Sequence, residues 1–301
     1  MSGSARPVVG IIGGSGVYDL DGLTDKEWRT VDSPWGKPSD QLLFASLDGM
    51  KVVFLPRHGR GHPLSPSDIN YRANIDALKR AGVTEILSVS AVGSLREDLE
   101  PGTFVLVDQF IDRTFAREKS FFGQGCVAHV SVAHPVCGRL GGHLLDAAGE
   151  TGIRLVEGGT YLAMEGLQFS TKAESKLYRS WGCDVIGMTN MPEAKLAREA
   201  ELCYASVAMV TDFDCWHPDH DHVTVEQVVK VLFSNADKAR ALVKAARSPI
   251  LPLPRQRGGK SVSSAAVAAP CKPRSRGESR FKESIKPNVR QTRLKSINKV
   301  Y

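Results

Sequence analysis

Short apolar runs alternate with helical patterns along the first 250 residues, and this alternation limits the fold more than any other feature. Several runs, among them residues 7–13 and 51–55, lack a polar residue at every second position, as is typical of strands covered on both faces. Strands are expected at Pro7–Gly13, Leu42–Leu47, Lys51–Leu55, Glu85–Ala91, Thr103–Ile111, Gly182–Met188 and Tyr204–Thr211. The pattern predicts an α/β fold, a single domain with a central mixed β-sheet flanked by helices.

Three short signals predict where helices begin. The segments 171–174, 190–193 and 224–227 each place Thr or Asn three residues ahead of Glu or Gln. Such a pair can satisfy two backbone N–H groups at a helix start, one by each side chain. Apolar residues at helical spacing after residue 224 predict a long amphipathic helix that closes the domain.

The composition changes near residue 250. Residues 255–301 hold 13 Lys and Arg against 2 Asp and Glu, whereas residues 1–254 hold 26 against 31, so the net charge of +6 combines an acidic body with a basic tail. We assign residues 1–250 to the folded domain and residues 251–301 to a tail that we expect to be disordered, because it has few large apolar residues. A nucleic-acid partner for this tail is the less favoured interpretation, since exposed basic tails are often only solvated extensions.

The six cysteines lie far apart and form no C-x-x-C pair, which disfavours a zinc ribbon or a redox motif. Four of them lie in apolar or mixed stretches, so the sequence favours buried thiols in a reducing compartment over a disulfide framework. The N-terminus has no apolar signal segment, and no later run has the length needed to cross a bilayer. We expect a cytoplasmic protein without a membrane partner.

Three segments with small or basic residues follow predicted strands. The glycines of residues 10–16 let backbone N–H groups approach an anion, and Ser15 adds a hydroxyl donor. Arg57 can bind phosphate through two parallel hydrogen bonds, with His58 as a further donor or a positive charge, and residues 90–94 supply small residues and hydroxyls. Each segment alone is also compatible with an ordinary turn or surface feature. Because α/β sheets bind ligands at the carboxyl ends of strands, their convergence predicts an anion site.

Two carboxylates follow the last predicted strand. Asp212 and Asp214 stand at i and i+2, so in an extended chain they project to the same side. The pair suits a purine, because one acid can donate to N7 while a carboxylate accepts from the exocyclic amine. From the residues alone, a solvated strand end is the commoner occurrence of such a pair.

The segment His217–His222 offers three imidazoles and two carboxylates. Its H-x-x-H-x-H spacing matches none of the familiar zinc signatures, so a polar loop beside a helix start is the favoured interpretation. We predict no metal site.

Taken in order, these segments resemble the 5'-methylthioadenosine phosphorylase branch of the purine nucleoside phosphorylase family. The resemblance spans nearly all of residues 8–245 and is therefore highly specific. It is carried by GIIGGSG at 10–16, RHG at 57–59, NYRANIDALK at 70–79, AVGSLRE at 91–97, GTFVLVDQFIDRT at 102–114, MEGLQFSTKAES at 164–175, VIGMTNMPEAKLA at 185–197 and YASVAMVTDFDCW at 204–216.

The resemblance assigns roles to individual residues. It implies phosphate binding by Ser15, Arg57, His58, Ser90, Ala91 and Thr189. It implies nucleoside binding by Met164, Glu165 and Met188 on the sugar side, by Ser170, Asp212 and Asp214 at the base, and by Val225 near the 5'-substituent. It further implies a homotrimer with active sites close to subunit boundaries, and a reaction without metal or organic cofactor in which phosphate is a co-substrate.

The implied reaction is phosphorolysis of 5'-methylthioadenosine to adenine and 5-methylthioribose 1-phosphate, catalysed by residues 1–250. Phosphate attacks C1' while hydrogen bonding or protonation at N7 stabilises the departing purine. We choose Asp212 as that acid, with Asp214 as its partner, which requires a pKa raised by burial or by the neighbouring carboxylate. An ionised Asp accepts from a 6-amino group, so the pair favours adenine over 6-oxopurines.

Other hypotheses remain open at this stage. Leu167 and Gln168 stand where many relatives have Pro-Arg, and the loop 60–66 is variable, which leaves the exact substrate open. The alternatives are a 6-oxopurine nucleoside or methylthioinosine phosphorylase, a nicotinamide-dependent dehydrogenase, and a nucleic-acid-binding protein acting through its tail. The glycine spacing at 10–16 is neither G-x-G-x-x-G nor that of a P-loop, which counts against the dehydrogenase.

Overall fold

The computed structural model of the 301-residue chain describes residues 7–14, 20–218, 225–246 and 267–268. The strands are β1 (Val9–Gly13), β2 (Leu23–Arg29), β3 (Leu42–Leu47), β4 (Met50–Pro56), β5 (Glu85–Ser94), β6 (Phe104–Val107), β7 (Gln109–Asp112), β8 (Ala128–His129), β9 (Leu155–Glu157), β10 (Thr160–Ala163), β11 (Val185–Gly187), β12 (Cys203–Asp212) and β13 (Val267–Ala268). The helices are α1 (Tyr71–Arg80), α2 (Gly138–Thr151), α3 (Lys172–Ser180), α4 (Asn190–Glu199) and α5 (Val225–Ala245).

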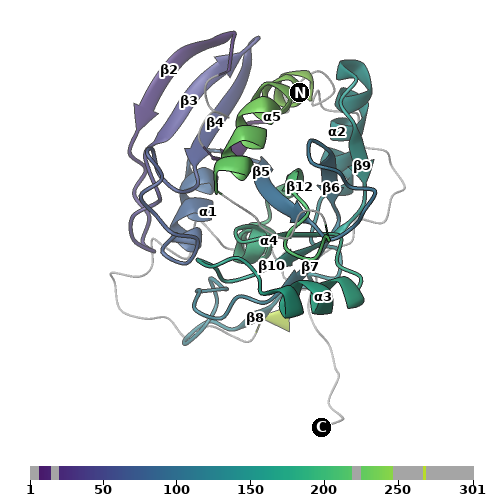
Figure 1. Cartoon of the computed structure of the whole chain (residues 1–301). Helices are drawn as coiled ribbons and strands as arrows, with labels where there is room; N and C mark the ends of the chain where they lie inside the picture. Colours follow the sequence, from purple (N-terminus) through teal and green to yellow (C-terminus); the bar gives the residue numbers. More distant parts are fainter. Residues whose placement is uncertain (1–6, 15–19, 219–224, 247–266, 269–301) are drawn as a thin grey trace, which may run out of the picture.

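Most strands form one mixed sheet of 11 strands, which confirms the predicted fold class (Figure 1). Its main path runs β2-β3-β4-β1-β5-β11-β10-β7, and β12, β6 and β9 branch from β5. Strands β4, β1, β5 and β12 lie side by side in this order and run parallel to one another. Their carboxyl ends therefore lie along one edge of the sheet, where α/β proteins bind ligands.

Two hydrophobic cores explain why the central strands lack polar alternation. Along β4, Val53 and Leu55 join a core with α1 and α4, whereas Val52 and Phe54 join a second core with α2 and α5. Successive side chains of a strand point to opposite faces, so both faces of these strands are apolar because helices cover both. Figure 1 shows α5 and α2 on one side of the sheet and α1 with α4 on the other.

Two details of the predicted elements differ from the structure. The expected strand at 103–111 is divided at Asp108, because β6 pairs with β12 whereas β7 pairs with β10. The capping pair at 171–174 is confirmed, with Thr171 and Glu174 each bonded to the other's backbone N–H. The pair at 190–193 is wrong: Thr189 is the residue at the helix start, and Asn190 and Glu193 are buried and bonded to other elements.

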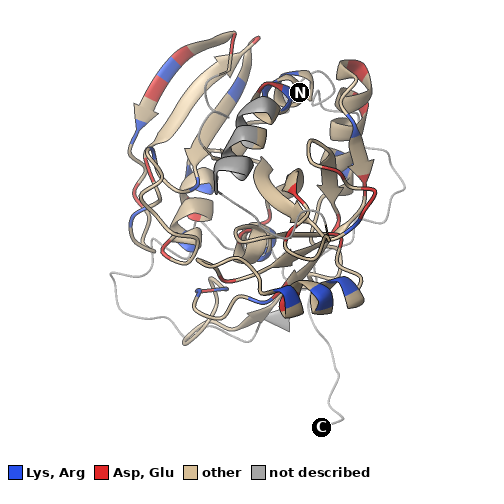
Figure 2. Ribbon diagram, in the orientation of Figure 1, with Lys and Arg blue, Asp and Glu red and all other residues tan. Residues whose placement is uncertain are grey.

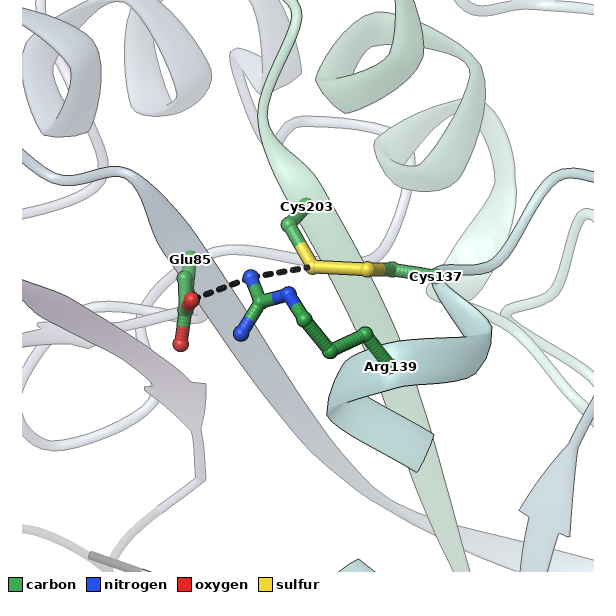
Figure 3. Close-up of a disulfide and its surroundings, with 4 residues drawn as sticks. All are labelled: Glu85, Cys137, Arg139 and Cys203. Atoms are coloured by element: carbon green, nitrogen blue, oxygen red, sulfur yellow. Dashed lines mark hydrogen bonds and ion pairs between the residues drawn. A yellow bond between two sulfur atoms is a disulfide. The ribbon is translucent and has the colours of Figure 1, made fainter. Parts of the chain in front are cut away.

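The prediction of free thiols is wrong for three cysteines. A disulfide joins Cys137, at the start of α2, to Cys203, at the start of β12 (Figure 3). Cys126 is disulfide-bonded as well, whereas Cys183 and Cys215 are free. Folding brings Cys137 and Cys203 together across 66 positions of sequence, and Cys137 N–H also donates to Tyr204 O at 2.7 Å. Sequence spacing could not show this contact, because it depends on how α2 packs on the sheet.

The described residues bear on three further predictions. None of the described helices combines the length and apolar character needed to cross a bilayer. Among the described side chains, no group of three or more His, Cys, Asp or Glu residues is arranged to hold a metal ion, and residues 219–222 of the histidine segment lie outside the described residues. The expected boundary at residue 250 and almost all of the basic tail also lie outside them.

Candidate active site

Arg57, the first described residue of the predicted phosphate site, lies beside the end of β1. Gly13 lies opposite Pro56 in the parallel pair β1–β4, and Arg57 N–H donates to Gly13 O at 3.0 Å. The loop that begins at Gly14 therefore leaves the sheet beside Arg57. Ser15, the predicted hydroxyl donor of this loop, lies outside the described residues.

Arg57 forms a buried ion pair with Glu193 of α4. Its Nε lies 2.9 Å from Glu193 Oε2 and its Nη2 lies 3.2 Å from Oε1, while Nη1 donates to Val89 O at 2.9 Å. Burial opposes the charge of Arg57, but the Glu193 carboxylate outweighs it and raises the pKa of the guanidinium. Glu193 thus occupies the Nε–Nη2 edge of the guanidinium, which limits direct contact with an anion to the Nη1 side.

His58 is fixed as a neutral ring. Its Nδ1 lies 2.9 Å from Leu64 O, which can only accept, so Nδ1 carries the proton and Nε2 is an acceptor. Burial lowers the pKa of His58 to about 4, and the ring stacks on His62 with centroids 4.0 Å apart. The lowered pKa disfavours a positive charge on His58 at neutral pH, and its contact with phosphate stays a prediction.

Ser90 and Ala91 lie within β5, which continues to Ser94, so the expectation that residues 90–94 follow the strand is wrong. Ser90 Oγ donates to Asn190 Oδ1 at 3.0 Å, and Asn190 directly follows Thr189. Thr189 N–H lies 3.4 Å from Tyr161 Oη. A Cβ at Gly187 would lie 2.0 Å from the same oxygen, so this position requires glycine. Ala91 follows Ser90 in β5, opposite Met209 of β12.

Asp212 and Asp214 lie together, although not for the reason given above. β12 ends at Asp212 and the chain turns, with Asp214 at a φ of 52°, so the pair does not share an extended strand. Asp214 N–H donates to Asp212 Oδ1 at 2.8 Å, and Thr211 Oγ1 donates to Asp212 Oδ2 at 2.7 Å. The opposing residue of β5 is Gly93, where a Cβ would lie 2.9 Å from Asp212 Oδ1. Glycine at this position leaves room for both carboxyl groups.

The two carboxyl groups differ in environment. Asp214 Oδ2 is buried without a hydrogen-bond partner in normal geometry. Burial, together with the charge of Asp212, raises the pKa of Asp214 to about 6, against a lowering effect of the Ser175 hydroxyl. Burial also raises the pKa of Asp212, but its two hydrogen bonds oppose that rise. The raised pKa makes Asp214 a candidate for the proton donor beside Asp212, which we chose from the sequence.

The amino acids predicted to bind the sugar lie near those predicted to bind the base, at the ends of β10 and β11. Met164 N–H donates to Gly187 O at 2.9 Å, and a Cβ at Gly166 would lie 2.6 Å from Met188 Sδ, so this sulfur packs directly on Gly166. Ser170 Oγ lies 3.7 Å from Met164 Sδ, and Cys215 Sγ donates to Ser170 O at 3.2 Å. The segment 164–170 thus connects the amino acids predicted to bind the sugar with the aspartate pair.

Glu165 is turned toward the protein. Its carboxylate accepts hydrogen bonds from Ser67 Oγ, from Phe115 N–H at 2.5 Å and from Ala116 N–H at 3.3 Å. Burial opposes its ionisation, but these bonds lower the pKa of Glu165 below its ordinary value. Any contact of Glu165 with a sugar therefore competes with existing partners. Val225 begins α5, and its side chain lies outside the described residues.

Sequence analysis missed a buried polar network beneath the site. Glu193 also accepts from Tyr204 Oη at 2.9 Å, and Asn190 Nδ2 donates to the same phenol at 3.1 Å and to Ser206 Oγ. The signal available was the pair at 190–193, which we interpreted as a helix start. Arg117, described below, was missed as well, because it belongs to no pattern.

Comparison with known proteins identifies the family of this site. A model described as the phosphorylase superfamily matches residues 8–247. The chain belongs to this superfamily. An S-methyl-5'-thioadenosine phosphorylase of Rhodospirillum rubrum is 73% identical over 240 residues, which cover 80% of this chain and 82% of the relative. The enzyme of the same name from Bradyrhizobium diazoefficiens is 67% identical over 238 residues, covering 79% and 82%.

Solved structures of the superfamily share the fold. A methylthioadenosine phosphorylase from an antarctic soil metagenomic library superposes with a TM-score of 0.85 at 44% identity, covering 94% of this chain and all (100%) of the other. The Schistosoma mansoni methylthioadenosine phosphorylase in complex with adenine gives a TM-score of 0.75 at 40% identity, covering 80% and 91%. The resemblance to the methylthioadenosine phosphorylase branch is thereby confirmed.

Proposed function

We propose that this phosphorylase splits 5'-methylthioadenosine with inorganic phosphate to adenine and 5-methylthioribose 1-phosphate, as a step of methionine and purine salvage. The observation that carries the proposal is the aspartate pair, in which Asp214 has a pKa of about 6 beside a hydrogen-bonded Asp212. Both relatives are named for this activity, and the match to this chain covers 82% of the length of each.

We assign different roles at the base to the two aspartates. Protonated Asp214 donates to N7 as the bond between C1' and N9 breaks and its electron pair enters the purine. Ionised Asp212 accepts from the 6-amino group, and Ser170 lies at the same end of the site. A 6-oxopurine would present an acceptor to this carboxylate, which disfavours the alternative of an inosine or methylthioinosine phosphorylase.

Phosphate attacks C1' from the face opposite the base, and the new bond joins a phosphate oxygen to C1'. We assign its binding to Ser15, Ser90, Ala91 and Thr189, with Arg57 limited to its Nη1 side. Neutral His58 would accept a hydrogen bond from a protonated phosphate oxygen. The reaction as proposed needs no metal or organic cofactor.

The assembly is proposed to be a homotrimer with the sugar side near a subunit contact. Three large apolar side chains are exposed there, Phe115 (81%), Phe169 (46%) and Leu167 (67%), and Phe115 N–H contacts Glu165. Such exposed apolar side chains are typical of protein contacts. Light scattering of the purified chain tests this proposal, and a monomer at micromolar concentration would contradict it.

Location and nucleic-acid binding remain expectations. The cytoplasmic assignment is weakened by the Cys137–Cys203 disulfide, since reducing compartments disfavour such bonds. Figure 2 shows acidic and basic residues mixed over the described elements, with Lys and Arg predominating on α3. This distribution gives no support to nucleic-acid binding by the described part of the domain.

The decisive experiment is an assay of adenine release from 5'-methylthioadenosine with and without phosphate, with inosine and methylthioinosine in parallel. Phosphate-dependent release of adenine with little turnover of the 6-oxo substrates is expected. Release without phosphate would identify a hydrolase, and a preference for inosine would overturn the account of Asp212 and Asp214.

A further inference from the structure

Arg117 is a buried arginine outside every motif considered above, and it lies on the sugar side of the site. It follows the exposed Phe115 and Ala116, yet its own side chain is 0% exposed. We propose that Arg117 is a positioning residue for nucleoside binding, which holds the two backbone segments that carry Met164, Glu165 and Met188. This inference rests on the proposed function, because it takes these residues to contact the sugar.

The guanidinium of Arg117 bonds to both segments at once. Its Nη1 donates to Met188 O at 2.5 Å, just after β11, and to Met191 O at 2.7 Å, in the first turn of α4. Its Nη2 donates to Glu165 O at 2.8 Å and lies 3.4 Å from Met164 O, after β10. These four carbonyls belong to chain segments more than twenty positions apart in sequence. Arg117 therefore joins the two segments beyond the point where the pairing of β10 with β11 ends.

The other contacts of Arg117 show that it acts through neighbouring groups. Its Nε lies 3.4 Å from Glu165 Oε1 and 3.3 Å from Ser67 Oγ, and Nη1 also lies 3.2 Å from Tyr71 Oη. The carboxylate of Glu165 balances its charge, and the donors are directed at protein oxygens. Arg117 therefore has no part in binding the reacting atoms and affects them through the segments that it joins.

Lysine cannot reproduce this arrangement. Arginine presents five N–H groups in a planar fork, whereas the ammonium of lysine is a compact charge with three donors. Arg117→Lys keeps the charge that Glu165 balances but cannot reach four carbonyls on two segments. Met188 has little freedom to adjust, because its sulfur already packs against Gly166. We expect the segments to separate or shift while the domain stays folded.

The two aspartates at the base are held by elements that Arg117 does not contact. Asp212 ends β12, which pairs with β5 along its whole length, and Asp214 is bonded to Asp212. Loss of the Arg117 contacts should therefore weaken binding of the whole nucleoside and leave binding of free adenine unchanged. A general loss of structure would weaken both, so the ratio of the two affinities distinguishes positioning from folding.

The test compares Arg117→Lys with wild type by calorimetric titration of 5'-methylthioadenosine without phosphate and of adenine. We expect the nucleoside Kd to rise about tenfold or more and the adenine Kd to stay within about twofold, since small misplacements of binding groups cost this much. Arg113→Lys is the matched control, an exposed arginine on the same loop whose backbone N–H bonds Ala163 O. It should leave both constants unchanged.

Equal weakening of nucleoside and adenine, or no change in either, would overturn the proposal. If Arg117→Lys does not fold, Arg117→Gln decides, because its shorter neutral amide can donate to one carbonyl but cannot join the two segments. Selective weakening of the nucleoside by this variant supports the proposal, and equal or absent effects contradict it. Failure of the wild-type chain to release adenine with phosphate would instead refute the proposed function itself.

Discussion

Two arginines lie buried beside the active site, and their charges are balanced in different ways. Arg57 bonds the carboxylate of Glu193 through two nitrogens at the phosphate side, where both partners are 2% exposed. Arg117 bonds mainly neutral carbonyls on the sugar side, and its nearest carboxylate contact, with Glu165, is 3.4 Å long. We therefore expect Arg57 to stabilise the folded strand ends, whereas Arg117 fixes their geometry.

Breaking the Arg57–Glu193 pair should have the largest effect on stability. Arg57→Met leaves Glu193 as an uncompensated buried charge, which costs about 3–5 kcal/mol of unfolding free energy. Urea unfolding measures this loss. The double variant Arg57→Met with Glu193→Leu should recover much of it, because it removes both charges. A loss below about 1 kcal/mol in the single variant would contradict a buried ion pair.

Removing the proposed acid tests the base side without touching either arginine. Asp214→Asn keeps the shape of the side chain but cannot transfer a proton, so kcat should fall about 100-fold. Asp212→Asn should instead change the preference among purines, because the amide can donate to a 6-oxo group. An unchanged kcat in Asp214→Asn would return the acid role to Asp212.

The pH dependence of stability and of activity follows from the carboxyl group of Asp214. Burial raises the pKa of Asp214 to about 6 from the ordinary 3.8, so the folded protein binds this proton more tightly than the unfolded chain. The associated stability is complete below about pH 3.8 and is lost as the pH rises through about 6. As the acid form is the active one, kcat/KM should decline above about pH 6. Asp214→Asn, measured over the same range, should lack this decline.

Gly93→Ala should have a smaller effect, confined to the base side. The added Cβ would lie 2.9 Å from Asp212 Oδ1 and 3.3 Å from Asp214 Cβ, so the pair must shift. We expect kcat/KM to fall about tenfold while phosphate affinity stays close to wild type. Full activity would show that the turn after β12 adapts more readily than its hydrogen bonds indicate.

The smallest effect is expected at the exposed start of α3. Thr171→Ala removes the hydroxyl that accepts from Glu174 N–H at the start of α3, which costs about 1 kcal/mol of stability. Thermal unfolding should register the change and kcat should not. Because its effect is limited to the stability of α3, this variant provides a reference for the stability and activity changes of the other variants.

Local patterns predicted what is local in this fold. The strand at Leu42–Leu47 and the capping pair at 171–174 were predicted from the sequence with their observed positions, since apolar content and capping chemistry act over a few residues. The Asp212–Asp214 pair was predicted as a site, and the pKa of about 6 at Asp214 favours that member as the acid, whereas we chose Asp212 from the sequence. That assignment depends on burial, which the sequence does not contain.

Long-range partners could not be predicted. Glu193 follows Asn190 at capping distance, yet its partner is Arg57, 136 positions earlier. Cys137 and Cys203 meet only because α2 packs where β12 begins. Arg117 bonds carbonyls, which every residue possesses, so no side-chain pattern marks its partners. In each case the missing information is the packing of distant elements.

Gly93 also has a consequence for how this enzyme can change. Because Asp212 Oδ1 lies 2.9 Å from where a Cβ of residue 93 would stand, we expect the position opposite to accept a replacement of equal size more readily than a longer one. An exchange of Asp for Asn fits, whereas Glu would need a second substitution elsewhere. Variation in base preference is therefore accessible by a single isosteric step, and other chemistries at this position are separated from the present enzyme by at least two.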